Sequence, residues 1–388
     1  MIKKAMTTSN TKKLAIFGNP VEHSLSPEIH KQFAEQCGLE VEYIKLKPEL
    51  DKFKEEVYRF FSKGDGIGDG ANVTIPFKQQ AYKLAQQDYI MKNHPGIAND
   101  SYLNARNDAL VSQGGNTLYL DSSQGDDSQG DNSQGDTTRA PHLNIYNTDG
   151  IGLVKDMTSN LGWDLKNKKI LLVGAGGAIR GIIPALARAI TGGNQGDKGD
   201  KGDTGDIGDT GDTGDIKRAE LIITNRTQER AESLVSYFRQ RASEGDLSIS
   251  AQQINSLDLN DISSSQILTA EKRAEKYHFD IIINGSAFGL GENTAENKYQ
   301  DENPSFLLTS SLLHKDLLCY DLVYSKDRST SFTKWARANR THQAKEAVDG
   351  LGMLVEQAAM SFRIWHSSDN VDLSKLDTQK VIKKLSPE

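Results

Sequence analysis

The chain contains little of what secreted, membrane and metal-binding proteins are built from. Its two cysteines, Cys37 and Cys319, cannot form a disulfide framework or a structural zinc site. No apolar run approaches the roughly 18–20 residues that span a bilayer, since the longest one, Ile170 to Ile179, ends at Arg180. The apolar stretch at residues 14–17 is too short for a signal peptide. We therefore expect a protein of the reducing cytoplasm that holds no metal.

The sequence also has no cluster of lysine and arginine interleaved with aromatic residues, which excludes an ordinary nucleic-acid surface. Its net charge of −7 comes from two low-complexity segments. Residues 121–136 hold five Asp and no basic residue, and residues 196–215 hold seven Asp and two Lys, so each segment carries −5 and the rest carries +3. That remainder is typical of a globular enzyme, and 388 residues predict two domains or three.

The two acidic segments predict disordered inserts at residues 121–142 and 192–216. The first repeats Ser-Gln-Gly-Asp, and the second has glycine at every third position from Gly196 to Gly214. A collagen-like triple helix is the alternative for the second, but the run contains no proline and is far shorter than a collagen stack. Low hydrophobicity combined with net charge favours disorder.

Up to about residue 150 the chain alternates short strands and helices. A helix is expected from Pro27 to Gln36, with Ser26 as its N-cap, and an amphipathic helix over residues 50–61. The last two strands predict a hairpin whose loop is the first insert. The expected strands cover residues 13–17, 42–46, 71–75, 116–120 and 143–146.

After residue 150, a helix to about Leu161 is followed by a pattern of a different kind. A buried-type strand, a glycine turn, a helix and a second strand form a βαβ unit, which joins parallel strands. This half therefore predicts a doubly wound parallel sheet in an α/β fold. The βαβ unit occupies residues 169–173, 174–177, 178–190 and 220–224, and further buried strands are expected at 280–284 and 317–322.

The glycine turn predicts a nucleotide site. Gly174, Gly176 and Gly177 stand between a strand and a helix, where bare backbone can approach a pyrophosphate whose charge the helix N-terminus stabilises. The strict G-x-G-x-x-G pattern fails at its last position, which is Ile179. A tight loop without a ligand is therefore the alternative.

The end of the following strand indicates which dinucleotide binds. An NAD site usually has Asp or Glu there, whereas this chain has Asn225-Arg226-Thr227 and then Arg230. Guanidinium groups match phosphate geometry with paired donors. These residues therefore favour the 2′-phosphate of NADP.

Short motifs along the chain follow an order that is characteristic of one enzyme family. They are GNP at 18–20, HSLSP at 23–27, NVTIPFK at 72–78, NTDG at 147–150, GAGGA at 174–178, NRT at 225–227, YDLVY at 320–324 and DGLGMLVEQA at 349–358. With them, the chain resembles shikimate dehydrogenase over about residues 13–366. The resemblance implies reversible, NADPH-dependent reduction of 3-dehydroshikimate to shikimate, a step of chorismate and aromatic amino acid biosynthesis.

The same resemblance implies an arrangement of domains. An N-terminal α/β substrate-binding domain, residues 13–150 plus 351–388, would accompany a Rossmann-like, doubly wound NADP-binding domain, residues 151–350, with a cleft between them. The enzyme would act as a monomer or a homodimer on a small-molecule substrate, with no nucleic-acid or membrane partner.

The resemblance also assigns roles to individual residues. Two serine hydroxyls would bind the substrate carboxylate, and a threonine and a lysine would contact the ring hydroxyls. Leu322 and Gly350 match family positions that lie near the nicotinamide. The substrate set is Ser24, Ser26, Thr74, Lys78, Asn116, Asp149, Tyr324 and Gln357, and the cofactor set is Gly174, Ala175, Gly176, Gly177, Ala178, Asn225, Arg226, Thr227, Arg230, Leu322 and Gly350.

Lys78 and Asp149 are the predicted catalytic pair. Hydride transfer to a ketone develops an alkoxide, so a proton donor must lie within hydrogen-bond reach of that oxygen. A nearby carboxylate would hold the lysine ammonium in place and favour its charged form. A solvated loop lysine is the alternative for Lys78, and which of the two groups transfers the proton stays open.

Some positions depart from the family pattern or leave a choice. Ile179 replaces a small residue at the start of the helix, and residues 284–287, Asn-Gly-Ser-Ala, replace a more hydroxyl-rich motif beside the nicotinamide ribose. Tyr146 stands where an acidic residue often precedes the NTDG motif. Asn116, in an Asn-Thr-Leu sequence, is the expected substrate ligand, with Asn107 as its competitor.

Two other functions stay open. An NAD-dependent quinate/shikimate dehydrogenase is one, and Arg226 and Arg230 argue against it. A catalytically silent NADP-binding regulatory protein is the other, and the intact pair of Lys78 and Asp149 argues against that.

Overall fold

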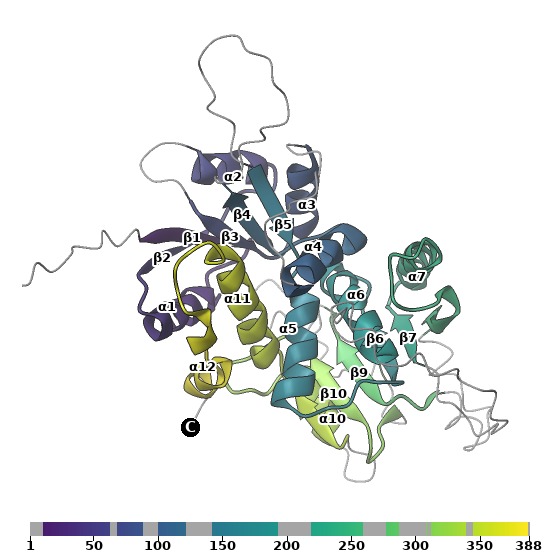
Figure 1. The fold of residues 1–388 in the computed structure, drawn as a ribbon. Coiled ribbons are helices and arrows are strands. Elements are labelled where there is room, and N and C mark those ends of the chain that lie inside the picture. Colours follow the sequence, from purple (N-terminus) through teal and green to yellow (C-terminus); the bar gives the residue numbers. More distant parts are fainter. Residues whose placement is uncertain are drawn as a thin grey trace, which may run out of the picture. The chain divides into compact units, whose positions relative to one another are not determined.

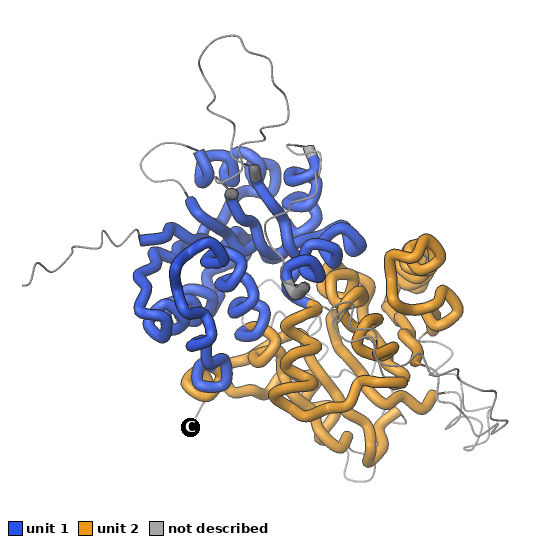
Figure 2. The backbone as a smooth tube through the Cα atoms, in the orientation of Figure 1, with its two compact units in different colours: residues 1–149, 355–381 blue, residues 150–354, 382–388 orange. Residues whose placement is uncertain are grey.

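The computed structural model describes residues 11–62, 68–87, 100–121, 142–192, 219–258, 277–286, 308, 312–338 and 344–386. Contacts within the chain divide it into unit 1, residues 1–149 and 355–381, and unit 2, residues 150–354 and 382–388 (Figure 2). The predicted inserts fall outside the described residues except for residues 121, 142 and 192, so their disorder stays a prediction. The predicted boundaries of the substrate and cofactor domains also stay a prediction.

Unit 1 is built on a five-stranded sheet in the order β2-β1-β3-β4-β5 (Figure 1). β1 pairs in parallel with β2 and β3, whereas β4 is antiparallel to both β3 and β5. β4 and β5 are therefore the expected hairpin, and the carboxyl ends of β1, β3 and β5 meet the amino end of β4 at one edge of the sheet. The strands are β1 (Lys12–Phe17), β2 (Val41–Leu46), β3 (Gly70–Val73), β4 (Thr117–Asp121) and β5 (His142–Tyr146).

Helices cover both faces of this sheet. Ala71 and Val73 of β3 join the core that α2 and α3 build on one face. Asn72 faces the other side, because side chains alternate along a strand, and there it contacts Ser361 of α11. The indole of Trp365 lies against β3 on that same face, where a Cβ on Gly70 would be 2.4 Å from it. The helices of unit 1 are α1 (Ser26–Cys37), α2 (Phe53–Phe61), α3 (Lys78–Gln87), α4 (Asp100–Ser112) and, from Val355 on, α11 (Leu351–Trp365).

The predicted N-cap of the first helix is wrong. Helix α1 begins at Ser26, and the residue before it, Leu25, already has helical dihedral angles with no side-chain cap. The hydroxyl of Ser24 accepts a hydrogen bond from the Ser26 amide at 3.2 Å, so Ser24 satisfies that donor instead. The chain therefore enters the helix one residue earlier than the position of Pro27 suggested.

Two further helix boundaries differ from expectation. The helix expected over residues 50–61 begins at Phe53, after a turn, and the helix expected to reach Leu161 is α-helical only from Asp149 to Lys155. A π-helical turn, Asp156–Asn160, completes it and buries the Asp156 carboxylate, which accepts a hydrogen bond from the Tyr320 hydroxyl at 2.6 Å. That long-range contact favours the wider turn, and the local sequence does not reveal it.

Unit 2 contains a six-stranded sheet in the order β11-β10-β9-β6-β7-β8, and every pair in it is parallel. Figure 1 labels β10, β9, β6 and β7 of this sheet. Residues 170–173 of the central strand β6 are all buried, as in sheets that helices cover on both faces. The predicted Rossmann-like parallel sheet is thereby confirmed. Its strands are β6 (Lys169–Val173), β7 (Glu220–Thr224), β8 (Ile254–Ser256), β9 (Ile281–Asn284), β10 (Leu318–Asp321) and β11 (Glu346–Val348).

The helices of unit 2 connect these strands. α7 packs against β7 and β8, and α10 packs against β10 and β11. In the part of the chain that the structure describes, no helix is long and apolar enough to cross a membrane. The helices of unit 2 are α5 (Asp149–Lys155), α6 (Gly177–Thr191), α7 (Gln228–Ser243) and α10 (Ser331–Ala338), with a short 3₁₀ turn at Ala251–Gln253. The 3₁₀ turn at Leu373–Lys375 belongs to unit 1, and the final helix α12 (Thr378–Leu385) begins in unit 1 and ends in unit 2.

Candidate active site

The predicted substrate residues of unit 1 lie at one edge of its sheet. The chain directions explain this, because β1, β3 and β5 end where β4 begins. Gln357 reaches the same edge from α11, where its side-chain oxygen lies 2.9 Å from the Asn116 amide nitrogen. After β1 come Ser24 and Ser26, after β3 come Thr74 and Lys78, before β4 comes Asn116, and after β5 comes Asp149.

Lys78 and Asp149 form an ion pair. Each is the first residue of a helix, and a carboxylate at a helix N-terminus is stabilised by the helix dipole. The Nζ atom of Lys78 donates to Oδ2 of Asp149, and the two side chains are 22% and 9% exposed. The Lys78 side chain is thus both paired and partly accessible, which a proton donor needs.

Asn116 fixes the Asp149 carboxylate from its other side. Its amide nitrogen lies 2.9 Å from Oδ1 of Asp149 and also 2.9 Å from the oxygens of Thr148 and Gln357. The side-chain oxygen of Asn116 accepts a hydrogen bond from the Thr148 backbone amide at 2.8 Å. All four residues are buried, whereas the competing Asn107 is exposed on α4.

The serine pair precedes and opens helix α1. The Ser24 hydroxyl donates to the Ser26 hydroxyl at 3.1 Å. The loop before them is held by β2, because Lys45 donates to the Glu22 carbonyl at 2.6 Å and Lys47 pairs with the Glu22 carboxylate, which lowers the pKa of that group to about 2. Two hydroxyls at a helix N-terminus suit an anion such as a carboxylate.

Thr74 lies in the tight turn between β3 and α3. Its carbonyl accepts the Phe77 amide at 2.9 Å, and its own amide donates to the Phe17 carbonyl at 2.8 Å. Its methyl group fills the space over Gly18, because a Cβ added to Gly18 would lie 2.4 Å from the Thr74 methyl carbon. The first glycine of the GNP motif therefore makes room for Thr74.

Sequence reasoning missed a polar layer beneath these residues. Ser361 accepts a hydrogen bond from the Asn72 amide at 3.1 Å and lies 2.7 Å from the Thr117 hydroxyl. Its own hydroxyl donates to the Gln357 carbonyl at 3.1 Å. Asn72 stands in the NVTIPFK motif, and Ser361 follows Gln357 by four residues on the same helix face, so both carried a signal that could have found them.

The glycine turn of unit 2 presents bare backbone. Gly174 has φ +112°, a conformation that favours glycine, and its amide donates to the Thr224 carbonyl at 2.7 Å. Gly176 and Gly177 are exposed, and a Cβ placed on either would meet no described atom within 4 Å. The N-terminus of α6 is therefore open to a phosphate group.

The predicted 2′-phosphate residues lie after the neighbouring strand, β7. The side chain of Asn225 donates to the Thr227 carbonyl at 3.0 Å, and α7 begins at the next residue. Arg226 and Arg230 are both exposed in the segment that enters this helix. Since β6 and β7 are adjacent and parallel, the arginines and the glycine turn lie at the same edge of the sheet.

Leu322 and Gly350 lie against each other in unit 2, where a Cβ on Gly350 would be 2.5 Å from the Leu322 carbonyl oxygen. Beside them, burial raises the pKa of Asp321 to about 6, and this carboxyl accepts the Thr330 hydroxyl at 2.6 Å. Tyr324, a predicted substrate contact, is half-buried in this unit and does not belong to the unit 1 cluster.

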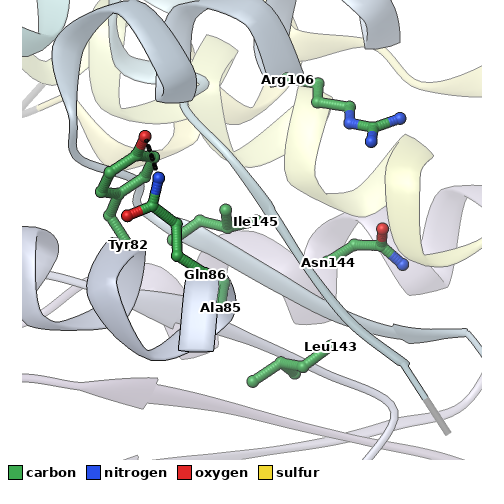
Figure 3. Close-up of a pocket in the computed structure, with 7 residues that line it drawn as sticks. All are labelled: Tyr82, Ala85, Gln86, Arg106, Leu143, Asn144 and Ile145. Carbon is green, nitrogen blue, oxygen red and sulfur yellow. Dashed lines mark hydrogen bonds between the residues drawn. The ribbon is translucent and has the colours of Figure 1, made fainter. Parts of the chain in front are cut away.

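The cavity drawn in Figure 3 is separate from the cluster of predicted substrate residues. It lies among α3, α4 and β5 and has a volume of about 10 Å³, which is room for about one water molecule. None of the predicted substrate residues lines it. Its lining residues are Tyr82, Ala85, Gln86, Arg106, Leu143, Asn144 and Ile145.

Comparison with known proteins finds shikimate dehydrogenase families near both ends of the chain. The shikimate dehydrogenase substrate binding domain family matches residues 16–90, and the shikimate 5′-dehydrogenase C-terminal domain family matches residues 350–369. A relative from Alkalilimnicola ehrlichii called shikimate dehydrogenase (NADP(+)) is 35% identical over 92% of this chain and 93% of its own. One of that name from Legionella pneumophila is 33% identical over 92% and 94%.

A solved structure is similar over almost the entire chain. An Ael1 enzyme from Pseudomonas putida has a TM-score of 0.62 at 27% identity and covers 97% of this chain and 99% of its own. The α/β fold class expected from the strand and helix pattern is therefore confirmed.

Proposed function

The chain belongs to the shikimate dehydrogenase family, and from that premise we propose that it catalyses the reversible, NADPH-dependent reduction of 3-dehydroshikimate to shikimate. The observation that carries the proposal is the ion pair of Lys78 with Asp149, whose second oxygen Asn116 holds. Relatives at 35% and 33% identity bear the name of an NADP(+)-dependent shikimate dehydrogenase. The reaction belongs to aromatic amino acid biosynthesis.

In the proposed complex, hydroxyl and amide groups of unit 1 hold the substrate. Ser24 and Ser26 bind its carboxylate at the N-terminus of α1. Thr74, Asn116 and Gln357, with Lys78 and Asp149, bind the ring hydroxyls. Support comes from their common place at one sheet edge and from the hydrogen bonds that join Asn116 to Gln357 and Asp149. Tyr324 is proposed as a further substrate contact.

In this proposal, the pair of Lys78 and Asp149 carries out the proton transfer. As the ketone is reduced, its oxygen gains negative charge, which the Lys78 ammonium stabilises and protonates. Asp149 keeps the ammonium in place, and Asn116 keeps the carboxylate from rotating away. In the direction of oxidation, the same pair takes up the hydroxyl proton of shikimate.

The cofactor set of unit 2 fits a dinucleotide. NADPH, when bound, supplies the hydride. The open backbone at Gly176 and Gly177 leaves space for a pyrophosphate at the N-terminus of α6. Arg226 and Arg230, with Asn225 and Thr227, would hold the 2′-phosphate at the entrance of α7. The remaining members of the set are Gly174, Ala175, Ala178, Leu322 and Gly350.

The test is an assay of shikimate oxidation by the purified chain with NADP and with NAD as the oxidant. We expect turnover with NADP and a kcat/KM at least about tenfold lower with NAD, because NAD gives the arginines no 2′-phosphate to bind. A preference for NAD, or oxidation of quinate in place of shikimate, would overturn the assignment. NADP binding without any shikimate oxidation would identify a silent binding protein.

Cytoplasmic location and the choice between monomer and homodimer remain predictions. The first rests on the two isolated cysteines, of which Cys319 is fully buried, where burial raises the pKa of its thiol. The second is decided by the mass of the purified chain in solution.

A further inference from the structure

Ile179 and Gly285 stand where the sequence motifs predict a departure from the family pattern, and the structure brings the two residues into contact. The central strands of unit 2 lie in the order β10-β9-β6 and end at the same edge (Figure 1). Gly285 follows β9, and its amide donates to the Val173 carbonyl of β6 at 2.8 Å. Ile179 lies in the first turn of α6, just after the glycine turn that follows β6.

The side chain of Ile179 occupies the space that a side chain at position 285 would need. A Cβ on Gly285 would lie 2.5 Å from Cδ1 and 2.7 Å from Cγ1 of Ile179, and 3.0 Å from Cδ1 of Leu322. Ile179 is fully buried, so it has little room to move away. The absence of a side chain at 285 is therefore what allows the large side chain at 179.

The backbone of Gly285 also lies close to the glycine turn. A Cβ on Gly174 would lie 3.1 Å from the carbonyl carbon and oxygen of Gly285, so the absence of a side chain at 174 lets the two backbones approach. Gly350, in turn, lies against the Leu322 carbonyl oxygen. One packed set of atoms thus joins the glycine turn, position 285, Leu322 and Gly350.

We propose that Ile179 and Gly285 form one compensated pair that positions the cofactor-binding edge of unit 2. The δ-methyl group of Ile179, seated over Gly285, fixes Leu322 and the glycine turn relative to each other, so the spacing between the two ends of the dinucleotide site depends on it. Ile179 is a positioning residue in this scheme. The inference rests on the proposed function, because it takes these positions to be the NADP site.

A double-mutant cycle tests the pair. The dissociation constant of NADPH is measured by fluorescence titration, and the melting temperature is recorded, for the unaltered chain, Gly285→Ala, Ile179→Ala and the double variant. Gly285→Ala alone overpacks the site and should raise the dissociation constant about tenfold. The double variant has space for the new methyl group and should return to within about threefold of the unaltered chain.

Ile190→Ala is the matched control. It removes the same atoms from a fully buried isoleucine on the same helix, but at the far end from the glycine turn. It should lower the melting temperature and leave the dissociation constant unchanged. A control that weakened NADPH binding as much as Ile179→Ala would overturn the proposal, since stability alone would then explain the effect.

Additive effects in the double variant, or unaltered NADPH binding by Gly285→Ala, would also overturn it. If Gly285→Ala does not fold, the decisive comparison is Ile179→Ala against the double variant, and there the added alanine should not weaken binding. Failure of the proposed function has a different readout. The unaltered chain would then bind NADPH without oxidising shikimate, and the NADPH dissociation constants of the four variants could still be compared.

Discussion

The candidate substrate edge of unit 1 presents side chains, whereas the candidate cofactor edge of unit 2 presents backbone. In unit 1, Asn116 lies 2.9 Å from three partner oxygens, and the groups around it are buried. In unit 2, Gly176 and Gly177 leave space, and Gly285 makes room for Ile179. Removing atoms should therefore damage the first edge most, because it leaves buried polar groups unpaired. Adding atoms should damage the second edge most, because it fills space that a ligand or a neighbour needs.

The largest expected effect is at the side-chain edge. Lys78→Ala removes the proposed proton donor and leaves Asp149 with one partner fewer, so kcat for shikimate oxidation should fall by about 10²- to 10⁴-fold. The KM for shikimate should change far less, because Ser24 and Ser26 still hold the carboxylate. Steady-state kinetics of both parameters measure this split.

Lys83→Ala is the control for that loss. Lys83 lies on the same helix, α3, and is exposed. Its removal should leave both kinetic parameters unchanged. An unaltered kcat in Lys78→Ala would show that the ion pair is only structural.

At the cofactor edge, removal of Arg226 should matter for one cofactor only. A charged hydrogen bond contributes about 1.5–3 kcal/mol, so Arg226→Ala should raise the dissociation constant of NADP by about 10- to 100-fold. Binding of NAD, which has no 2′-phosphate, should be unaffected. Equal losses for both dinucleotides would place Arg226 elsewhere in the site, and Arg230→Ala gives an independent reading.

Much of this contrast was predictable from sequence, since each edge is built from local motifs. A strand followed by Gly-Ala-Gly-Gly-Ala predicts its own turn, and the residues 72–78 place Lys78 just after a strand wherever that strand lies. The strand order β10-β9-β6 is different, because strand order depends on how the crossovers pack. The contact between Ile179 and Gly285 follows from strand order and could not be read from the chain.

The residues of the polar layer of unit 1 carried a signal in the sequence, but the contacts among them could not be predicted, for a related reason. Ser361 contacts Asn72 and Thr117 only because α11 is rotated so that this face meets β3 and β4. The sequence of α11 marks an apolar helix without fixing that rotation. The N-cap prediction at Ser26 failed similarly, since the residue before Ser26 already has helical dihedral angles.

The interiors of the two units should also respond to pH with opposite signs. In unit 1, burial lowers the pKa of His30 to about 3, so between pH 6.5 and 3 the unfolded chain binds more protons and stability is lost as the pH falls. In unit 2, burial raises the pKa of Asp321 to about 6, so stability is lost as the pH rises from about 4 to 6. Acid sensitivity below pH 6.5 is therefore a property of the unit 1 core.

His30→Phe tests that assignment, because a ring of similar size replaces one that stacks on Tyr43 at 4.7 Å. Chemical denaturation at pH 5, 6 and 7.5 should show that the variant loses less stability on acidification, by about 1.4 kcal/mol for each pH unit below 6.5. His366, whose pKa is also lowered by burial, should keep part of the slope. Parallel curves for variant and parent would contradict the assignment to His30.

The smallest effect is expected where neither edge is touched. Residues 196–215 carry −5 and belong to the connection between α6, which ends at Thr191, and β7, which begins at Glu220. Both ends are fixed within unit 2, so deleting the segment shortens only the connection, and loop-closure entropy changes by about 1 kcal/mol for such a change in length. Activity with NADP should stay within about twofold. A variant with the seven Asp changed to Asn keeps the length and replaces the net charge of −5 with +2 from the two lysines, so a loss shared by both variants would show that the acidic charge itself acts on the cofactor edge.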